Sequence, residues 1–325
     1  MMARALWTVA AGHCEIRTEN LPQRAPGQAL VRALASGVSR GTERLVLMGR
    51  VPDSQRDAMR CPFQAGDFPF PVKYGYSAVG VVEEGPDALL GRRVFVLHPH
   101  QDIFLAPVGM CIPVPDAVPD ARAVLAANME TAVNILWDAR PLAGERALVI
   151  GAGVVGLLVA ALLARMPGME VVVCDLDPRR RPMVEALGAR FAAPEDAPAD
   201  RDLVIHASAD PAGLRRALEL CAFEARIVEA SWYGTREATL PLGEAFHARR
   251  LQIISTQVGA VAPAMRGRRT HGERMALALS LLADARFDSL VGPATPFADL
   301  AGAMPRLLNP PPGDAPPLCP LVTYG

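Results

Sequence analysis

Residues 147–166 read ALVIGAGVVGLLVAALLARM, and this stretch decides the fold. An apolar, strand-like run leads into Gly151, Gly153 and Gly156, and an apolar segment of helical length follows and ends before Pro167. The three glycines have the spacing of a turn that binds the pyrophosphate of a dinucleotide. Gly151 allows the tight turn, Gly153 lets the backbone approach the phosphates, and Gly156 lets the helix pack on the strand.

The start of this helix completes the predicted phosphate site. Val154 and Val155 open the helix, and the first N–H groups of a helix attract phosphate together with its dipole. The next strand-like run ends in Asp175, nineteen residues after Gly156. A carboxylate at this spacing accepts hydrogen bonds from the ribose hydroxyls of NAD and repels the 2′-phosphate of NADP.

The arginines that follow Asp175 favour NADP over NAD. Arg179 and Arg180 come four and five residues later, and an arginine just past this strand can hold a 2′-phosphate. Their alternative interpretation is the solvated start of a helix. We expect NAD as the cofactor because of Asp175, with NADP as the second possibility.

Strand-like and helix-like runs alternate from residue 146 onward. The apolar runs predict strands at 147–151, 170–175, 202–208, 225–231 and 251–258, and helices at 154–166, 181–189, 211–221 and 243–250. Apolar strands that alternate with helices predict a doubly wound parallel sheet with helices on both faces. We assign residues 129–262 to this Rossmann dinucleotide-binding domain.

The chain before the Rossmann domain has a different texture. Short β-like runs separated by glycine and proline predict a compact β-rich domain over residues 1–128. Within it, a long loop at 49–72 carries Phe63, Phe68 and Phe70. This loop suits contact with a bulky or apolar substrate, or equally a contact in a homodimer.

The chain after the Rossmann domain is too short to fold alone. Residues 263–325 contain one clear helix, expected at 271–286, and a proline-rich tail. We therefore expect this segment to return to the first domain and pack on it.

Composition excludes several classes of partner. The 325 residues carry a formal net charge of −1 and no extended basic run, so we expect neither nucleic acid nor a membrane surface as a partner. The six cysteines include no CxxC pair, which argues against a structural zinc lobe and suits a reducing compartment. The sequence has no recognisable signal peptide or membrane-spanning run, so we expect a soluble, cytoplasmic protein that acts on a small molecule.

The β-rich domain, the Rossmann domain and the C-terminal return together resemble the medium-chain dehydrogenase/reductase superfamily over nearly the whole chain. The resemblance rests on SGVSRGTE (36–43), YGYSAVGVV (74–82), META (129–132) and GAGVVG (151–156). It implies an α/β fold made of a GroES-like β-rich catalytic domain and a Rossmann domain. Within the superfamily, the chain is most similar to the group around bacteriochlorophyllide a dehydrogenase, which oxidises a hydroxyethyl substituent to an acetyl.

The resemblance also shows where zinc ligands are missing. Zinc alcohol dehydrogenases bind the metal with a cysteine, a histidine and a second cysteine, at positions that hold Ser39, Tyr76 and Ala127 here. Ser77 replaces a glutamate, and the proton-relay serine or threonine of those enzymes falls on Gly41. Zinc is held by cysteine, histidine or carboxylate, so we expect no metal at this position.

Tyr76 and Ser39 are the catalytic candidates. In the superfamily frame, the Tyr76 hydroxyl points where a zinc-bound substrate oxygen would lie, so it could stabilise that oxygen, or exchange a proton if its surroundings lowered its pKa. Alternatively, Tyr76 only fills the volume of the absent metal and satisfies its hydroxyl on backbone. Ser39 could donate to the same oxygen or could be a local backbone cap.

The resemblance implies further cofactor-binding residues outside the glycine motif. Arg40 matches a superfamily position that often reaches the cofactor pyrophosphate. The remaining candidates are Thr131, Ser208 and Ser231.

Other polar residues near the motifs have weaker interpretations. His98 and His100 lie together in VFVLHPHQD, but two histidines need a third ligand, and only Asp102 is nearby. Lys73 and Glu43 could form an ion pair, with Glu43 in a structural role.

These features together predict a zinc-independent, NAD(P)-dependent oxidoreductase that transfers hydride between the nicotinamide and a secondary alcohol or ketone. Two alternatives stay open. One is quinone or enoyl reduction on the same fold, and the other is a dinucleotide-binding protein that has no catalytic activity.

Overall fold

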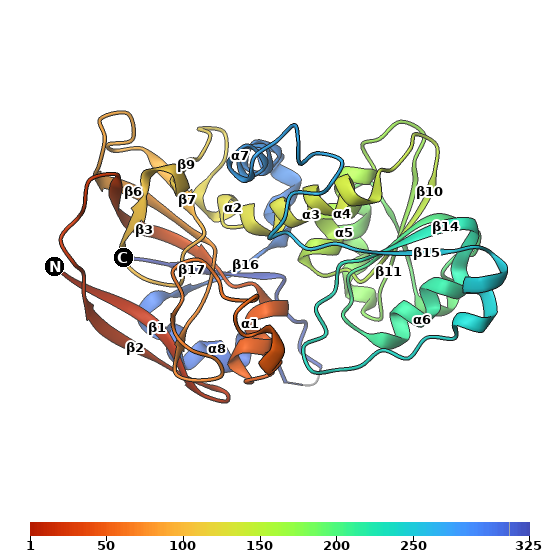
Figure 1. Cartoon of the computed structure of the whole chain (residues 1–325), viewed down its shortest axis with the longest axis horizontal. Helices are drawn as coiled ribbons and strands as arrows, with labels where there is room; N and C mark the ends of the chain where they lie inside the picture. The colour runs from red at the N-terminus through yellow and green to blue at the C-terminus, as the bar shows by residue number, and fades with distance from the viewer. Residues whose placement is uncertain (312) are drawn as a thin grey trace. The chain divides into compact units, whose positions relative to one another are not determined.

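The computed structural model describes residues 1–311 and 313–325 and divides into two compact units (Figure 1). The first unit comprises Met1–Ala127 and Met275–Gly325, and the second comprises Asn128–Arg274. The final segment of the chain thus belongs to the same unit as its start.

The second unit extends past residue 262, where the sequence placed its end. Arg274 is buried, and its guanidinium donates to Glu130 Oε1 at 3.0 Å and to Asn134 Oδ1 at 2.6 Å. It also bonds the carbonyl oxygen of Ala260. Because a buried guanidinium requires such partners, these contacts keep residues 263–274 with the Rossmann unit.

The first unit is rich in antiparallel strands. Its smaller sheet has the order β2 (His13–Asn20), β1 (Met2–Ala10), β5 (Val72–Lys73), β4 (Ala65–Gly66). Its larger sheet has the order β16 (Val291–Pro296), β17 (Cys319–Thr323), β3 (Gln28–Gly37), β6 (Ala78–Glu84), β7 (Arg93–Val96), β9 (Ile112–Pro113), with β8 (Ile103–Pro107) paired to β3. This unit contains the helices α1 (Arg40–Leu47), α2 (Asp120–Ala123) and α8 (Leu300–Leu308), and the larger part of α7 (His271–Leu281).

The C-terminal strand β17 is an internal strand of the larger sheet. It pairs antiparallel with β3, where Val322 lies opposite Ser36, and parallel with β16. Val322 is fully buried and packs with α8 residues such as Leu300 and Leu308. The end of the chain therefore contributes both backbone pairing and core to the first unit.

The second unit is a six-stranded parallel sheet. Its order is β12 (Arg190–Ala192), β11 (Glu170–Cys174), β10 (Arg146–Ile150), β13 (Arg201–His206), β14 (Cys221–Glu229), β15 (Gln252–Ser255). The helices that contribute most of their residues here are α3 (Ala126–Ala139), α4 (Val154–Leu163), α5 (Arg181–Ala186) and α6 (Pro211–Leu220), and α7 (His271–Leu281) begins here. This is the strand order of the predicted doubly wound sheet. The chain adds β11 and β12 on one side of β10, and β13, β14 and β15 on the other.

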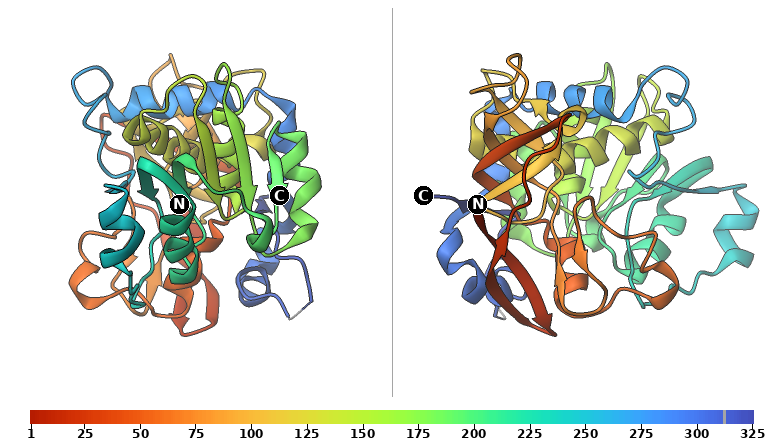
Figure 2. Two further views of the ribbon diagram at one scale, coloured as in Figure 1. Left: turned by 90° about the vertical axis from the view of Figure 1, so that its right-hand side faces the viewer. Right: turned by 60° about the vertical axis from the view of Figure 1, so that its left-hand side comes forward.

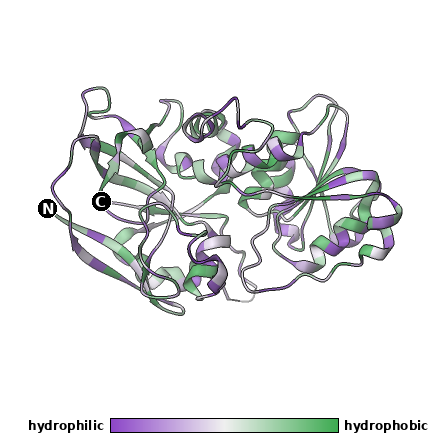
Figure 3. Cartoon of the chain, viewed as in Figure 1, coloured by the Kyte–Doolittle hydropathy of each residue, from purple (hydrophilic) through white to green (hydrophobic). Residues whose placement is uncertain are grey.

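The core of the second unit follows from the apolar runs seen in the sequence. Val172 on β11 and Val204 on β13 are fully buried, as is nearly every residue of α4. The α4 helix packs on β10 and β11, and α6 packs on β13 and β14. The left view of Figure 2 shows helices to both sides of the strands, and Figure 3 shows how strongly apolar these strands are.

One predicted helix is wrong in form. The segment expected as a helix at 243–250 contains an irregular turn, Leu242–Phe246, in which Glu244 leaves helical geometry with φ −99° and ψ −125°. Pro241 directly precedes this turn and Gly243 lies within it, and both residue types form helices poorly. The short strand β12 was not predicted, because three residues give too little alternation to be recognised.

Within the described part of the chain, no helix is both long and apolar enough to cross a lipid bilayer.

Candidate functional sites in the two units

The turn between β10 and α4 has the geometry that a phosphate-binding loop requires. Gly151 has φ +109°, and a Cβ at this position would lie 2.8 Å from the backbone nitrogen of Ser208. A Cβ at Gly156 would lie 2.0 Å from the carbonyl oxygen of Gly151. At Gly153, which caps α4, a Cβ would meet nothing within 4 Å. Two glycines thus close the turn, and the third leaves open space in front of the helix.

Val154 and Val155 form the first turn of α4 and are half-buried, while Gly153 is exposed. The backbone N–H groups at the start of a helix have no partner within that helix. The predicted phosphate contacts are therefore in an accessible place.

Asp175 directly follows β11 and faces the glycine turn. Its Oδ2 accepts a 2.6 Å hydrogen bond from the N–H of Ala152, and its Oδ1 accepts one of 2.8 Å from the N–H of Asp177. The carboxylate is half-buried, so it keeps an accessible edge. In this orientation it can accept hydrogen bonds from a ribose bound beside the glycine turn.

The two arginines predicted to compete with Asp175 lie beside another carboxylate. Arg179 donates from Nε to Asp177 Oδ1 at 2.7 Å, and Arg180 Nε lies 3.9 Å from Asp177 Oδ2. Burial lowers the pKa of Arg180, whose side chain is enclosed, against the opposing effect of the two aspartates. A 2′-phosphate here would meet two carboxylates as well as the arginines.

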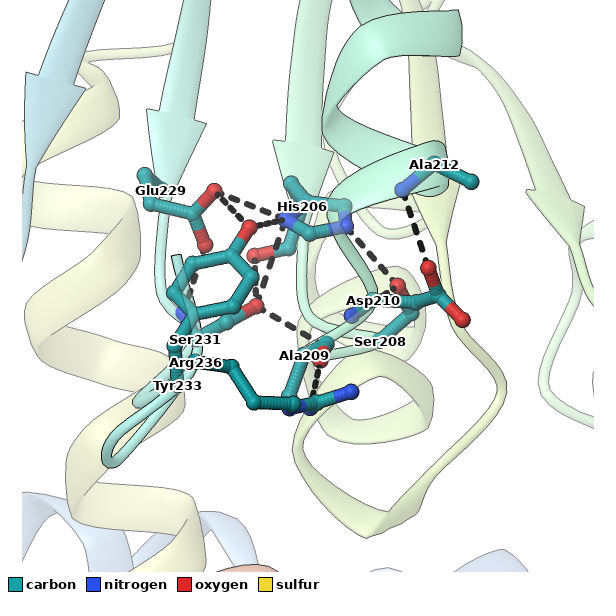
Figure 4. A network of polar contacts seen from close by, with 9 residues as sticks. All are labelled: His206, Ser208, Ala209, Asp210, Ala212, Glu229, Ser231, Tyr233 and Arg236. Atoms are coloured by element: carbon teal, nitrogen blue, oxygen red, sulfur yellow. Dashed lines mark hydrogen bonds and ion pairs between the residues drawn. The ribbon is translucent and has the colours of Figure 1, made fainter. Parts of the chain in front are cut away.

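Ser208 and Ser231, both predicted to contact the cofactor, lie just beyond the carboxyl ends of β13 and β14 (Figure 4). The Ser208 hydroxyl lies 2.8 Å from His206 Nε2, and the Ser231 hydroxyl accepts a 3.0 Å bond from the N–H of Ala209. Both hydroxyls thus have partners within the protein. Thr131 lies within α3, and its contact with the cofactor stays a prediction.

In the first unit, Tyr76 and Ser39 form a hydroxyl pair. The Tyr76 hydroxyl donates to Ser39 Oγ at 2.6 Å. Ser39 occupies the residue before α1, yet its side chain makes no capping bond to that helix. The structure therefore favours neither the backbone cap proposed for Ser39 nor a Tyr76 hydroxyl satisfied on backbone.

Tyr76 is half-buried. Burial raises the pKa of its hydroxyl above the ordinary value, although the bond to Ser39 acts in the opposite direction. The burial of Tyr76 therefore does not favour the alternative of proton exchange, which required surroundings that lower this pKa. A raised pKa favours the protonated phenol, in which the hydroxyl is a hydrogen-bond donor.

A buried polar chain, which sequence reasoning missed, lies next to this pair. Glu43 Oε1 accepts from the N–H of Ser39 at 2.7 Å, and Glu43 Oε2 lies 3.1 Å from His100 Nε2. His100 Nδ1 lies 2.7 Å from Ser36 Oγ, which in turn lies 2.9 Å from the Tyr324 hydroxyl. Glu43 thus fixes the backbone of Ser39 through contacts that sequence spacing does not reveal.

Lys73 and His98 have other partners than the sequence suggested. Lys73 donates to Glu19 at 2.7 Å and to Gln101 at 3.0 Å, so it does not pair with Glu43. His98 stacks on Phe104, and burial lowers the pKa of its imidazole to about 3.

Metal binding was considered for the two histidines of the HPH sequence. His98 Nδ1 lies 2.9 Å from the carbonyl oxygen of Pro99, whereas His100 bonds Ser36 and Glu43. The two imidazoles therefore have separate partners. Among the described residues, no cluster of three or more histidine, cysteine, aspartate or glutamate side chains has the arrangement of a metal site.

Arg40 is the first residue of α1, and its Nε donates to the carbonyl oxygen of Leu307 at 3.1 Å. Its contact with a pyrophosphate stays a prediction.

The phenylalanines of the 49–72 loop pack within their own unit. Phe63 lies 5.0 Å from the His98 ring, and the buried Phe68 lies 5.7 Å from the Tyr74 ring. Phe70 covers Gly49, where a Cβ would lie 2.9 Å from its ring. These contacts explain the aromatic content of the loop without a substrate, so its role in substrate or dimer contact stays open.

No protein-family profile matches the chain. The chain is 28% identical over 238 residues to 2-desacetyl-2-hydroxyethyl bacteriochlorophyllide A dehydrogenase of Cereibacter sphaeroides. The matched region covers 67% of this chain and 70% of the relative.

Two solved structures resemble the whole chain. One is described as a zinc-binding dehydrogenase of Sinorhizobium meliloti bound to NADP, and the other as a short chain alcohol dehydrogenase of Escherichia coli CFT073 with NADH. Each has a TM-score of 0.79 and 17% identity, with 99% of both chains covered. At this identity the likeness shows the fold alone. The chain thus has the fold of the medium-chain dehydrogenases and reductases, and its curated relative supports a place in that superfamily.

Proposed function

We propose that this chain is an NAD(P)-dependent oxidoreductase that moves hydride between the nicotinamide and a secondary alcohol or ketone, without a catalytic metal. The glycine turn carries the proposal. A Cβ has no room at Gly151 or Gly156 but has open space at Gly153, which is the pattern expected where a pyrophosphate approaches the backbone. Asp175 faces the same turn and offers acceptors for a ribose.

NAD is the proposed cofactor in preference to NADP. A 2′-phosphate beside Asp175 would also lie near Asp177, which already engages Arg179. Repulsion between a phosphate and two partly desolvated carboxylates opposes NADP binding.

The substrate class follows from the resemblance and from the curated relative. The name of that relative includes a hydroxyethyl substituent on a bacteriochlorophyllide, and a 1-hydroxyethyl group is a secondary alcohol. We carry over only this class of reacting group.

Metal independence rests on the donor set. The positions that hold zinc in the related alcohol dehydrogenases are occupied by the hydroxyl groups of Ser39 and Tyr76 and the methyl group of Ala127. Zinc binds thiolate, imidazole and carboxylate, so these three side chains do not fit a metal. The two hydroxyl groups are suited instead to hydrogen bonding with a substrate oxygen.

The direction of the hydroxyl bonds assigns the roles. Because Tyr76 donates its only hydroxyl hydrogen to Ser39 Oγ, the hydrogen of Ser39 is left for another acceptor. We assign Ser39 as the donor to the reacting oxygen, with Tyr76 polarising it and Glu43 holding its backbone. A donor placed in this way stabilises the negative charge that develops on a carbonyl oxygen during reduction. The bound nicotinamide supplies or accepts the hydride.

Alanine at two glycines of the turn tests the cofactor site. Gly153→Ala should raise the Kd for NADH by at least about tenfold, because a methyl group blocks the approach of the pyrophosphate. It should change the free energy of unfolding by less than about 1 kcal/mol, because a Cβ there meets no neighbour. Gly156→Ala should lower the free energy of unfolding by about 2 kcal/mol or more, because the turn must open. NADH titration and urea denaturation measure both effects, and Gly153→Ala protein with wild-type NADH affinity would refute the site.

Asp175 tests the choice of cofactor. Wild-type protein should bind NADH at least about tenfold tighter than NADPH, and Asp175→Ala should narrow or reverse this ratio because one repelling carboxylate is gone. Calorimetric titration with both cofactors measures the ratio. Tighter binding of NADPH by the wild type would show that the arginines outweigh the two aspartates.

Conservative substitutions distinguish the proposed roles of Tyr76 and Ser39. Ser39→Ala should lower kcat by about a hundredfold on the best substrate from a panel of secondary alcohols and methyl ketones, because the direct donor is lost. Tyr76→Phe should lower kcat and kcat/KM together by about tenfold and leave NADH affinity unchanged.

The matched control is Tyr74→Phe. Tyr74 lies edge-on to Tyr76, with ring centroids 6.0 Å apart, and its hydroxyl bonds the carbonyl oxygen of Met59. Its loss should leave kcat near the wild-type value. A Tyr76→Phe enzyme with full activity would show that Tyr76 only fills space.

A further inference from the structure

A second buried polar network lies at the carboxyl edge of the Rossmann sheet (Figure 4). His206 ends β13 and Glu229 ends β14, and the two residues are paired in the strand register. His206 Nδ1 lies 2.7 Å from Glu229 Oε2, and the imidazole is fully buried. Neither residue belongs to the glycine turn or to the hydroxyl pair of the first unit.

The chemistry of the two side chains gives the direction of the hydrogen bond between His206 and Glu229. Burial acts to raise the pKa of Glu229, but hydrogen bonds from His206 and Ser231 outweigh it and hold that pKa below its ordinary value. A carboxylate only accepts hydrogen bonds, so in the contact with Glu229 Oε2 the donor is His206 Nδ1. His206 Nε2 then bonds the Ser208 hydroxyl at 2.8 Å.

The pair connects the loops that follow the two strands. On the β14 side, Glu229 Oε1 accepts from the N–H of Ser231 at 2.7 Å, and Glu229 Oε2 accepts from the Tyr233 hydroxyl at 3.0 Å. On the β13 side, His206 holds Ser208, whose Oγ also accepts from the N–H of Asp210 at 3.2 Å.

Hydrogen bonds also join the loop after β13 directly to the loop after β14. The N–H of Ala209 donates to Ser231 Oγ at 3.0 Å, and Arg236 donates to the carbonyl oxygen of Ala209. Figure 4 shows these side chains converging between the two strand ends. The conformation of each loop is therefore set by the buried pair and by the other loop.

The same loops border the proposed dinucleotide site. Ala207 N–H donates to the carbonyl oxygen of Ile150 at 2.9 Å, directly before Gly151. The absent side chain of Gly151 leaves room for the backbone of Ser208. In a doubly wound sheet, one mononucleotide half lies over each half of the sheet. Since Asp175 follows β11, the half with the nicotinamide lies over the β13 and β14 ends.

We propose that His206 and Glu229 are positioning residues for the nicotinamide half of the cofactor. They hold residues 207–210 and 230–236 in the shape that receives it. This assignment rests on the proposed function and adds two residues that the dinucleotide motif does not contain.

The start of α6 shows how tightly this network is enclosed. A Cβ at Gly213 would lie 2.8 Å from both His206 Nε2 and Ser208 Oγ. The helix therefore approaches the imidazole without a side chain between them, and the imidazole has little freedom to move.

Glu229→Gln tests the assignment with almost no change in shape. Glutamine has one acceptor oxygen, whereas the native carboxylate accepts from His206, Ser231 and Tyr233. We compare the affinity for NADH with that for ADP, which contains the adenosine and phosphates but no nicotinamide. The variant should raise the Kd for NADH by about tenfold and change the Kd for ADP by less than about twofold.

The matched control is Glu224→Gln on the same strand. Glu224 is exposed and pairs with the exposed Arg250, so its loss should leave both affinities unchanged. If Glu229→Gln fails to fold, Tyr233→Phe decides the question, because it removes one donor to Glu229 without leaving a buried group unpaired. It should raise the Kd for NADH by about threefold and leave the Kd for ADP unchanged.

The outcomes separate this assignment from the proposed function. A folded Glu229→Gln protein that loses affinity for NADH and ADP equally would show that the pair only maintains the fold, and unchanged NADH affinity would also overturn the assignment. Wild-type protein that binds neither ligand would overturn the proposed function itself, and the assignment with it.

Discussion

The close contact between Gly156 and the carbonyl oxygen of Gly151 is the constraint on which the Rossmann unit depends. A Cβ at Gly156 would lie only 2.0 Å from that oxygen, so the helix α4 can begin directly against β10 only when glycine occupies the position. This contact places the start of α4 at the carboxyl edge of the sheet, directly after β10. Asp175, Ser208 and the loop after β14 are then arranged around one turn. The geometry of the proposed cofactor site is thus a consequence of backbone packing.

The parts of the fold that were predicted from sequence are those governed by local rules. The α/β class, the glycine turn and the alternation of strands and helices are confirmed, because apolar period and glycine spacing report them directly. The segment at 243–250 was predicted as a helix and is irregular, since composition alone does not reveal the geometry of Glu244.

The polar networks show the limit of such reasoning. Glu43 and His100 are 57 residues apart, and Ser36 and Tyr324 are 288 apart, so only the fold brings them together. His100 was considered as a metal ligand because a neighbouring histidine was visible in the sequence. Its partners in the structure are Ser36 on β3 and Glu43 on α1. The same holds for His206 and Glu229, which pair because β13 and β14 are neighbours in the sheet.

A hydroxyl pair in place of a metal site is the central chemical claim. Zinc would polarise a substrate oxygen through direct coordination, whereas Ser39 can only donate one hydrogen bond that Tyr76 strengthens. The raised pKa of Tyr76 suits this role, because a phenol that stays protonated keeps donating.

The metal content of purified protein that turns over substrate tests this claim most directly. We predict far less than one zinc per chain, with turnover and thermal stability unchanged after chelation. A content of about one zinc per chain, removed by a chelator together with activity, would contradict the account.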